Sequence, residues 1–355
     1  MNLDDPAAVR RIDQSDFADL IEQFPQQLIW GEEITSKVSL PKWKASGFSN
    51  LVVVGMGGSA IAAEIAKSFL SSELKIPFHI VRNYQLPEFV NQKTLLIVSS
   101  YSGNTEETLS AYAQGRKHKA KIVGIASGGK LASLCQKHRI PLVTLPTGYP
   151  PRAAVGYSLA VILTLLGRLN LVNPKSKELN RTASFLNSLS QEHSANRLTD
   201  DNPAKLLAAK LSGKVPVIYA GEDYFFSVAV RWKQQICENA KTPAFCNVFP
   251  EFNHNELVGW SDNFPLKEKL VVIVLRDKQD HRRIQARMEI VKGILKEKQI
   301  EVMEVESTGK TLLERMLSLV LLGDWVSYYL AILNEVDPTS IEVIDYLKRS
   351  LEQVR

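Results

Sequence analysis

Residues 94–108 read Thr-Leu-Leu-Ile-Val-Ser-Ser-Tyr-Ser-Gly-Asn-Thr-Glu-Glu-Thr, an apolar run that ends in a loop of hydroxyl groups and glycine. This order predicts a buried strand, a loop, and a helix that begins near Thr105. The hydroxyls of Ser100, Ser102 and Thr105 then meet backbone N–H donors at a helix N-terminus, which carries a partial positive charge. A helix cap uses one hydroxyl, and this loop has three. The two additional hydroxyls favour a phosphate-binding loop over an ordinary cap.

Apolar strands alternate with helical segments along the rest of the chain. Strands are expected at 51–54, 78–81, 95–98, 122–125 and 142–145, and again at 215–220, 245–248, 270–275 and 302–305. This alternation predicts parallel sheets with helices on both faces, and the unbroken Val, Ile and Leu runs fit strands buried on both sides. We therefore expect an α/β protein.

The length of 355 residues favours two domains. Residues 1–170 are expected to form the first domain, opened by one or two amphipathic helices, and 171–202 a helical linker. Residues 203–355 are expected to form the second domain and to end in helices. The second half repeats the order strand, loop, helix but is poor in glycine, so we expect only the first domain to keep a full phosphate cradle.

Composition narrows the class of protein. Apolar residues make up 45% and the net charge of +5 is spread over short clusters, which argues against a nucleic-acid partner and suits a small anionic ligand. The 3 cysteines are too few for a disulfide framework or a zinc site, so we expect a reducing compartment and no metal. No signal peptide is apparent, and the apolar stretches 155–166 and 316–322 fall short of the ~20 residues of a membrane span. We expect a cytoplasmic protein with no membrane partner.

A glycine turn, Gly55-Met-Gly-Gly-Ser-Ala60, follows the first predicted strand. It matches the G-x-G-x-x-A dinucleotide pattern, but the next strand ends in Arg82 and not in the acidic residue that binds the ribose. An NADP-dependent oxidoreductase is therefore a weak alternative. The simpler interpretation is a turn whose backbone approaches a small ligand while Ser59 offers a hydroxyl.

Three further residues stand in settings that suit catalysis. Arg152 follows two prolines at the start of an apolar helix, where the dipole disfavours a cation; this indicates a bound anion or a solvated arginine. Glu238 lies in the last turn of a long helix, where the dipole favours proton uptake by a general base, although a surface glutamate is the commoner alternative. His254, in a polar loop, is the leading titratable candidate among 6 histidines.

Taken together, these motifs resemble the bifunctional phosphoglucose/phosphomannose isomerase family of the sugar isomerase (SIS) domain superfamily. The resemblance covers nearly the whole chain and rests on segments 55–59, 99–107, 148–152, 238–241, 253–256 and 337–348, in the family's order. It implies two flavodoxin-like SIS domains, a homodimer, and no cofactor. The implied activity is aldose–ketose isomerisation of glucose 6-phosphate, mannose 6-phosphate and fructose 6-phosphate in carbohydrate metabolism (glycolysis and gluconeogenesis).

The resemblance also implies which residues bind and which react. The substrate phosphate is expected on Gly57, Gly58, Ser59, Ser100, Ser102 and Thr105. Glu238 is implied as the general base that moves a proton between C2 and C1 through a cis-enediol. His254, donated by the neighbouring subunit, is implied as the ring-opening residue, together with Lys348.

Weaker assignments complete the implied site. Arg152, with Pro151 beside it, would stabilise negative charge on the enediol oxygens. Thr339 is the nearest match to a late threonine that lets C2 rotate, so that mannose 6-phosphate is accepted. A non-catalytic SIS-domain regulator that binds a sugar phosphate is the alternative from another class. Such regulators commonly carry a DNA-binding domain, and the first 48 residues are too short and too acidic for one.

Overall fold

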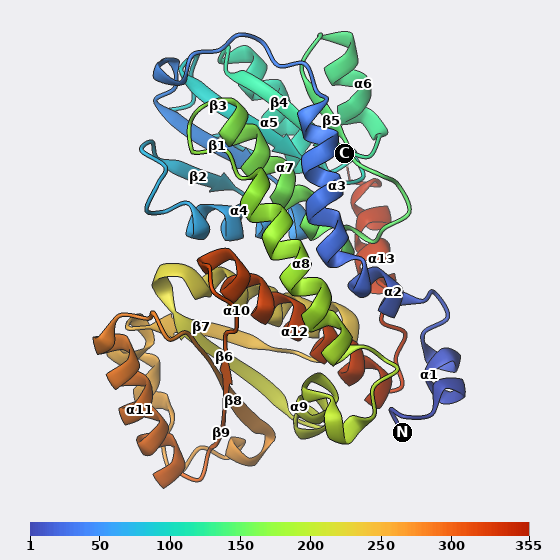
Figure 1. Ribbon diagram of the computed structural model, residues 1–355, viewed down its shortest axis with the longest axis vertical. Helices are drawn as coiled ribbons and strands as arrows, with labels where there is room; N and C mark the ends of the chain where they lie inside the picture. The colour runs from blue at the N-terminus through green and yellow to red at the C-terminus, as the bar shows by residue number, and fades with distance from the viewer. Residues whose placement is uncertain (355) are drawn as a thin grey trace. The chain divides into compact units, whose positions relative to one another are not determined.

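The computed structural model describes residues 1–354 and consists of two compact units (Figure 1). The first-sheet unit comprises Glu22–Ser188 and Gly309–Glu314. The second-sheet unit comprises Met1–Ile21, Leu189–Thr308 and the described residues from Arg315 onward. Each unit is built on its own sheet, so each is described by itself.

The first-sheet unit contains a parallel sheet in the order β2-β1-β3-β4-β5. Its strands are β1 Asn50–Val54, β2 Phe78–Val81, β3 Thr94–Ser99, β4 Lys121–Ala126 and β5 Leu142–Thr144. The central strands β1 and β3 are buried along their whole length, as predicted for strands covered on both faces. In this strand order the chain turns in opposite directions after β1 and after β3, which opens a crevice at their carboxyl ends.

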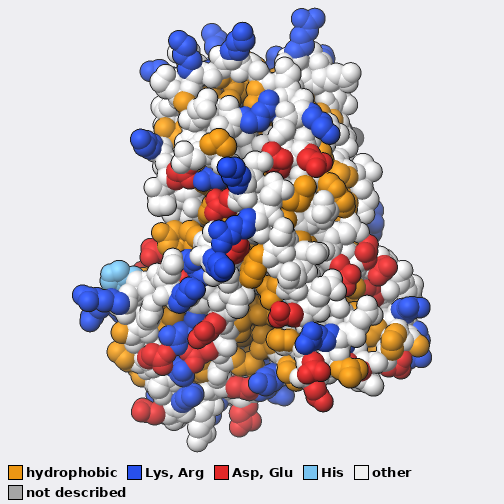
Figure 2. Space-filling view, viewed as in Figure 1, with side chains coloured by type: hydrophobic (Ala, Val, Ile, Leu, Met, Phe, Trp, Pro, Cys, Tyr) orange, Lys and Arg blue, Asp and Glu red, His pale blue; other side chains and the backbone are white. Residues whose placement is uncertain are grey.

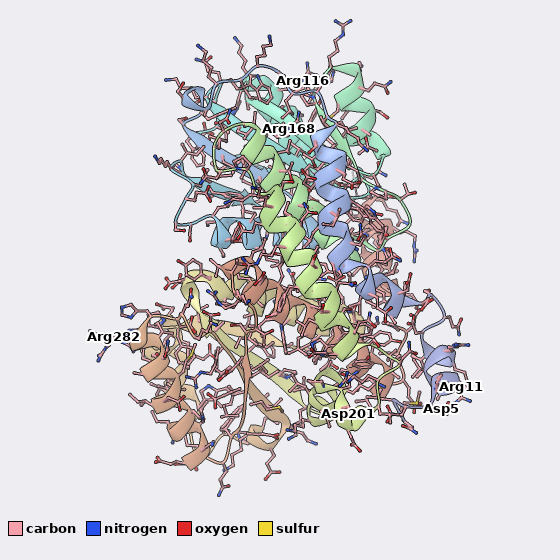
Figure 3. The ribbon with its side chains drawn as sticks, in the orientation of Figure 1. Asp5, Arg11, Arg116, Arg168, Asp201 and Arg282 are labelled. Carbon is pink, nitrogen blue, oxygen red and sulfur yellow. The ribbon has the colours of Figure 1, made fainter. Side chains whose placement is uncertain are left out.

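Helices cover both faces of the first sheet. They are α3 Phe24–Ser36, α4 Gly57–Phe69, α5 Glu106–Lys117, α6 Gly129–Lys137 and α7 Val155–Arg168, and α8 Ser176–His193 follows. Helix α7 is buried except at its last residue and packs on α3 so closely that a Cβ on Gly31 would lie 2.8 Å from that of Ala160. Arg168, labelled in Figure 3, donates a hydrogen bond to the Thr35 carbonyl at the end of α3.

The second-sheet unit contains a parallel sheet in the order β7-β6-β8-β9. Its strands are β6 Val215–Gly221, β7 Phe245–Phe249, β8 Leu270–Arg276 and β9 Glu301–Glu306. Its helices are α1 Pro6–Ile12, α2 Phe17–Glu22, α9 Pro203–Leu211, α10 Glu222–Ala240, α11 Arg282–Glu297, α12 Leu312–Leu333 and α13 Glu342–Leu351. The last residue of α2 and the first three residues of α12 belong to the first-sheet unit. Two parallel sheets flanked by helices confirm the predicted fold class.

The first residues of the chain belong to the second-sheet unit, whereas the sequence placed them with the first domain. Asp5, labelled in Figure 3, caps α1 by accepting a hydrogen bond from the Ala7 N–H at 3.0 Å. The buried Lys205 ammonium lies 2.9 Å from a carboxylate oxygen of Asp4 and ties this segment to α9. Because that pair joins residues 201 positions apart, no local pattern announces it. The boundaries after residues 170 and 202 stay predictions.

Helix α12 is longer than the apolar stretch 316–322 suggested. Gly323 and Asp324 follow that apolar stretch directly, and α12 runs for 22 residues through both positions. Gly323 lies against the Trp232 indole, where an added Cβ would come within 2.4 Å of Nε1, and Asp324 forms a buried ion pair with Arg231. By length and composition α12 is able to cross a membrane, but 89% of its apolar window is buried inside the fold, as in a core helix.

Charged side chains of both signs lie on the face shown in Figure 2, together with apolar patches. Lys and Arg stand without Asp or Glu along the upper edge of that view, and the two signs mix in its lower part.

Candidate functional site

The hydroxyl loop connects β3 to α5, as predicted. Thr105 is the N-cap residue of α5, but its side chain makes no capping hydrogen bond. Its hydroxyl instead lies 2.8 Å from the hydroxyl of Ser100, which is 2% exposed. Ser102 is exposed and accepts a hydrogen bond from the Asn104 N–H at 3.3 Å. No described side chain thus caps the first turn of α5, whose N–H groups are left as donors for an anion.

Glycine is required at the tip of this loop. Gly103 has φ +69°, and a Cβ there would lie 1.9 Å from the Gly128 carbonyl oxygen. The next residue, Asn104, accepts a hydrogen bond from the Lys130 N–H at 3.0 Å, and the Leu131 N–H donates to the Gly103 carbonyl at 2.9 Å. The start of α6 therefore holds the loop in place before any ligand arrives.

The glycine turn lies next to the hydroxyl loop, at the neighbouring strand β1. Helix α4 begins at Gly57, which has φ +49°, and its N-cap residue Met56 makes no side-chain capping bond. A Cβ on Gly55 would lie 3.1 Å from the Ser99 carbonyl oxygen, which places the turn against the end of β3. Ser59 is buried in the first turn of α4. Two helix N-termini without side-chain caps therefore come together at the crevice between β1 and β3, which suits a phosphate dianion.

The turn that carries Pro151 and Arg152 packs on this pair of loops. A Cβ on Gly58 would lie 2.4 Å from the Pro151 carbonyl oxygen, so only glycine fits that contact. Tyr101, inside the hydroxyl loop, donates its hydroxyl proton to the Pro146 carbonyl at 2.8 Å and accepts from the Tyr149 N–H at 3.0 Å. Arg152 is only 3% exposed, so the alternative of a solvated arginine is wrong.

All eight expected residues of the first half thus lie in three adjoining segments of the first-sheet unit. Sequence reasoning missed Tyr101, which ties two of these loops together. The only signal was its position between two of the expected phosphate ligands.

Glu238 lies in the last turn of α10, as predicted, in the second-sheet unit. The helix ends on Lys241, which adopts the left-handed conformation with φ +54°. The Lys241 ammonium donates to the carbonyl oxygens of Glu238 at 2.7 Å and of Asp337 at 2.8 Å. Glu238 is half-buried and lines a cavity of about 580 Å³ between this helix end and the start of α13.

Thr339 follows the Asp337 segment that Lys241 holds. Its N–H donates to the Asp337 carboxylate at 2.7 Å, and the cavity wall continues from Ser340 to Ile344. The structure therefore brings the late threonine and Glu238 to the same region of the second-sheet unit. Lys348 stands apart on α13, where its side chain is 64% exposed and lies 3.6 Å from Asp345.

His254 is exposed at the end of a short 3₁₀ turn, Glu251–His254. Neither His254 nor Lys348 is among the described residues that line the Glu238 cavity. No group of three or more His, Cys, Asp or Glu side chains among the described residues is arranged to hold a metal ion.

The second sheet has acidic groups where the first has its helix N-termini without side-chain caps. Helix α10, after β6, begins with Glu222 and Asp223, and β8 is followed by the buried Asp277. Arg315 donates a hydrogen bond to the Asp277 carboxylate at 2.7 Å. Burial raises the pKa of the nearby Asp280 to about 6. The exposed carboxylates of Glu222 and Asp223 at the start of α10 repel a phosphate dianion, whereas Asp277 is neutralised by Arg315.

Comparison with known proteins identifies the relatives of this chain. It is 40% identical over 335 residues to a bifunctional phosphoglucose/phosphomannose isomerase from Caldicellulosiruptor bescii, with 94% of this chain and 98% of that protein covered. The chain belongs to the bifunctional phosphoglucose/phosphomannose isomerase family. A protein of the same name from Aquifex aeolicus is 34% identical, with 94% of this chain and 98% of that protein covered. The resemblance inferred from the motifs is therefore confirmed, and this family member is an isomerase.

Domain families and solved structures agree with this membership. Residues 48–164 match the SIS domain, and residues 200–351 match the bacterial phospho-glucose isomerase C-terminal SIS domain. A crystal structure of a glucose-6-phosphate isomerase like protein from Thermus thermophilus superimposes with a TM-score of 0.64 at 18% identity, and covers 98% of this chain and 99% of that chain. At this identity the likeness shows the shared fold.

Proposed function

We propose that the protein interconverts glucose 6-phosphate and mannose 6-phosphate with fructose 6-phosphate. The observation that carries the proposal is the pair of helix N-termini without side-chain caps, α4 and α5, which meet at the crevice of the first sheet beside the buried Arg152. This cradle suits a phosphate monoester, and curated relatives that match nearly the whole chain are isomerases of that name.

The phosphate group is bound by backbone N–H groups and hydroxyls of the two loops. The residues proposed for this role are Gly57, Gly58, Ser59, Ser100, Ser102 and Thr105. A phosphate anchored away from the reacting carbons orients C1 and C2 toward the base and lowers the entropic cost of the reaction. Pro151 and Thr339 contact the sugar, and Thr339 leaves room for C2 to rotate.

The chemical step is a proton transfer. Glu238 removes the proton from C2 of the open-chain aldose and returns it to C1, while the O2 hydroxyl proton moves to O1. The two sugars are isomers, so no electrons leave the substrate and no cofactor is consumed. Arg152 stabilises the negative charge of the enediol oxygens between the two steps.

The sugar ring must open before C2 can react. His254, together with Lys348, moves the proton between the ring oxygen and the anomeric hydroxyl. His254 comes from the neighbouring subunit of a homodimer, which fits its exposed position and its absence from the described lining of the Glu238 cavity. The enzyme acts in the cytoplasm.

A coupled assay tests this function. Purified protein with fructose 6-phosphate should form glucose 6-phosphate, detected through glucose-6-phosphate dehydrogenase, and mannose 6-phosphate should be converted in the same way. Glu238→Gln should lower kcat by orders of magnitude while substrate still binds. Binding of fructose 6-phosphate by a wild-type protein without turnover would instead favour the non-catalytic regulator.

The shared site has its own test. A mixture of Glu238→Gln and His254→Ala subunits, unfolded and refolded together, should regain activity that neither parent has, because one hybrid site then holds both native residues. A mixture that stays as inactive as its parents would place both residues in one chain's site.

A further inference from the structure

The segment that carries His254, residues 252–260, is attached to the second sheet by several side-chain contacts. Phe252, which is fully buried, stacks on Tyr219 of β6 with ring centroids 4.1 Å apart and an angle of 4° between the planes. Trp260 donates its indole N–H to the Tyr219 hydroxyl at 3.0 Å. The two ends of the segment therefore meet on one buried side chain.

Glu256 forms the third attachment, two residues after His254. One carboxylate oxygen accepts the hydroxyl proton of Tyr219, and the other accepts from the Asn247 side-chain amide at 2.7 Å. Tyr219 and Asn247 are register partners on the adjacent strands β6 and β7. A single carboxylate thus bridges two neighbouring strands and ties the segment to both.

The donor and the acceptor in each hydrogen bond of the Tyr219 hydroxyl are fixed by its partners. The indole of Trp260 is a donor only, so the phenol oxygen accepts there and its single proton goes to Glu256. Burial of Tyr219, with Glu256 beside it, raises the pKa of the phenol. The hydroxyl therefore stays protonated, and so remains a donor, throughout the pH range in which the enzyme is active.

We propose that Glu256 and Tyr219 are positioning residues that hold His254 for opening the sugar ring. This inference rests on the proposed function. In this role the two residues act through the backbone on both sides of an exposed histidine whose own turn is only four residues long. A general acid or base must lie within hydrogen-bond reach of its proton, and a displacement of about 1 Å costs up to ~100-fold in rate.

Two substrates separate positioning of His254 from a general loss of structure. Fructose 6-phosphate reacts only after its ring opens, whereas 5-deoxyfructose 6-phosphate lacks the hydroxyl that closes the ring and is always open. Tyr219→Phe keeps the ring stack but loses the proton donated to Glu256, and Glu256→Gln loses one of the two acceptor oxygens. Both variants should lose about 10- to 100-fold in kcat for fructose 6-phosphate and stay within about twofold of wild type for the open analogue.

Two control variants show whether a loss of rate is specific to the positioning of His254. Tyr112→Phe removes the hydroxyl of another buried tyrosine, which donates to the Leu134 carbonyl at 3.1 Å in the first-sheet unit, and should leave both rates unchanged. His254→Ala should show the same discrimination between substrates as the positioning variants. If Tyr219→Phe does not fold, Asn247→Ala takes its place.

Equal losses on both substrates, or no loss on either, would overturn the positioning role. If His254→Ala lowered the rate with both substrates equally, the ring-opening role of His254, on which the positioning role rests, would be refuted. Wild-type protein inactive on both sugars would refute the proposed function itself.

Discussion

Gly58→Ala tests whether the glycine turn and the Arg152 turn form one rigid unit. The added Cβ would lie 2.4 Å from the Pro151 carbonyl oxygen and 2.9 Å from its carbonyl carbon, while ordinary contact begins at 3.4 Å. The two backbones must therefore separate by about 1 Å, since neither contact atom belongs to a flexible side chain. Overpacking of this kind costs about 1–3 kcal/mol of stability.

The same displacement moves the glycine turn, which is proposed to bind the phosphate, away from Arg152. A misplacement of about 1 Å costs on the order of 100-fold in rate, so kcat/KM for fructose 6-phosphate should fall by about that factor. The coupled assay measures kcat and KM, and urea denaturation measures the loss of stability. Gly58 is buried in α4, and its φ lies outside the left-handed range, so the contact with Pro151 is the main obstacle.

Gly293→Ala is the matched control. Gly293 lies in α11, and a Cβ there meets nothing within 4 Å. Alanine should raise helix stability by about 0.5–1 kcal/mol and leave kcat/KM unchanged. If Gly58→Ala kept kcat/KM within twofold of wild type, the two turns would not act as one unit.

Three further predictions follow from individual contacts. The double variant Ser100→Ala, Thr105→Ala should raise KM at least ~10-fold with little change in kcat, because phosphate binding is shared by ground state and transition state; a fall in kcat alone would contradict this. Burial raises the pKa of Asp280 to about 6, so its native form binds more protons than the unfolded chain between about pH 4 and 6, and stability falls as pH rises through that range. Asp280→Asn should therefore gain up to about 3 kcal/mol at pH 8 and nothing near pH 4 in urea titrations, and an equal gain at both pH values would refute the assignment. Arg231→Met leaves Asp324 buried without its 2.8 Å partner and should cost about 3–5 kcal/mol, which Asp324→Leu in the same chain should largely restore.

The sequence predicted the strands of both sheets because most of them are apolar runs between polar loops, although β9 alternates apolar residues with glutamate. It did not predict α6, in which only Leu131 and Cys135 are buried and which begins after Gly128 without a capping side chain. Nor did it predict α9, whose attachment to the chain's start depends on the buried Lys205. These features depend on contacts between distant segments, which a local pattern does not contain.

The candidate site also contains features that the local sequence predicts and features that depend on contacts between distant segments. Local chemistry was enough for the hydroxyl loop and the glycine turn, since both precede a helix N-terminus. The buried state of Arg152 and the attachment of Glu256 to Tyr219 and Asn247 were not predicted. Glu256 follows His254 by two residues, yet its partners come from two other strands, so its role becomes visible only when the sheet is assembled.

Isotope exchange tests most directly whether Glu238 moves the proton. Fructose 6-phosphate incubated with wild-type enzyme in D₂O should acquire deuterium at C1, and the glucose 6-phosphate formed should carry deuterium at C2, both visible by NMR. Glu238→Gln should show no incorporation above the uncatalysed rate while fructose 6-phosphate still binds in titration calorimetry. Incorporation by Glu238→Gln at the wild-type rate would show that another group is the base, and would contradict the mechanism.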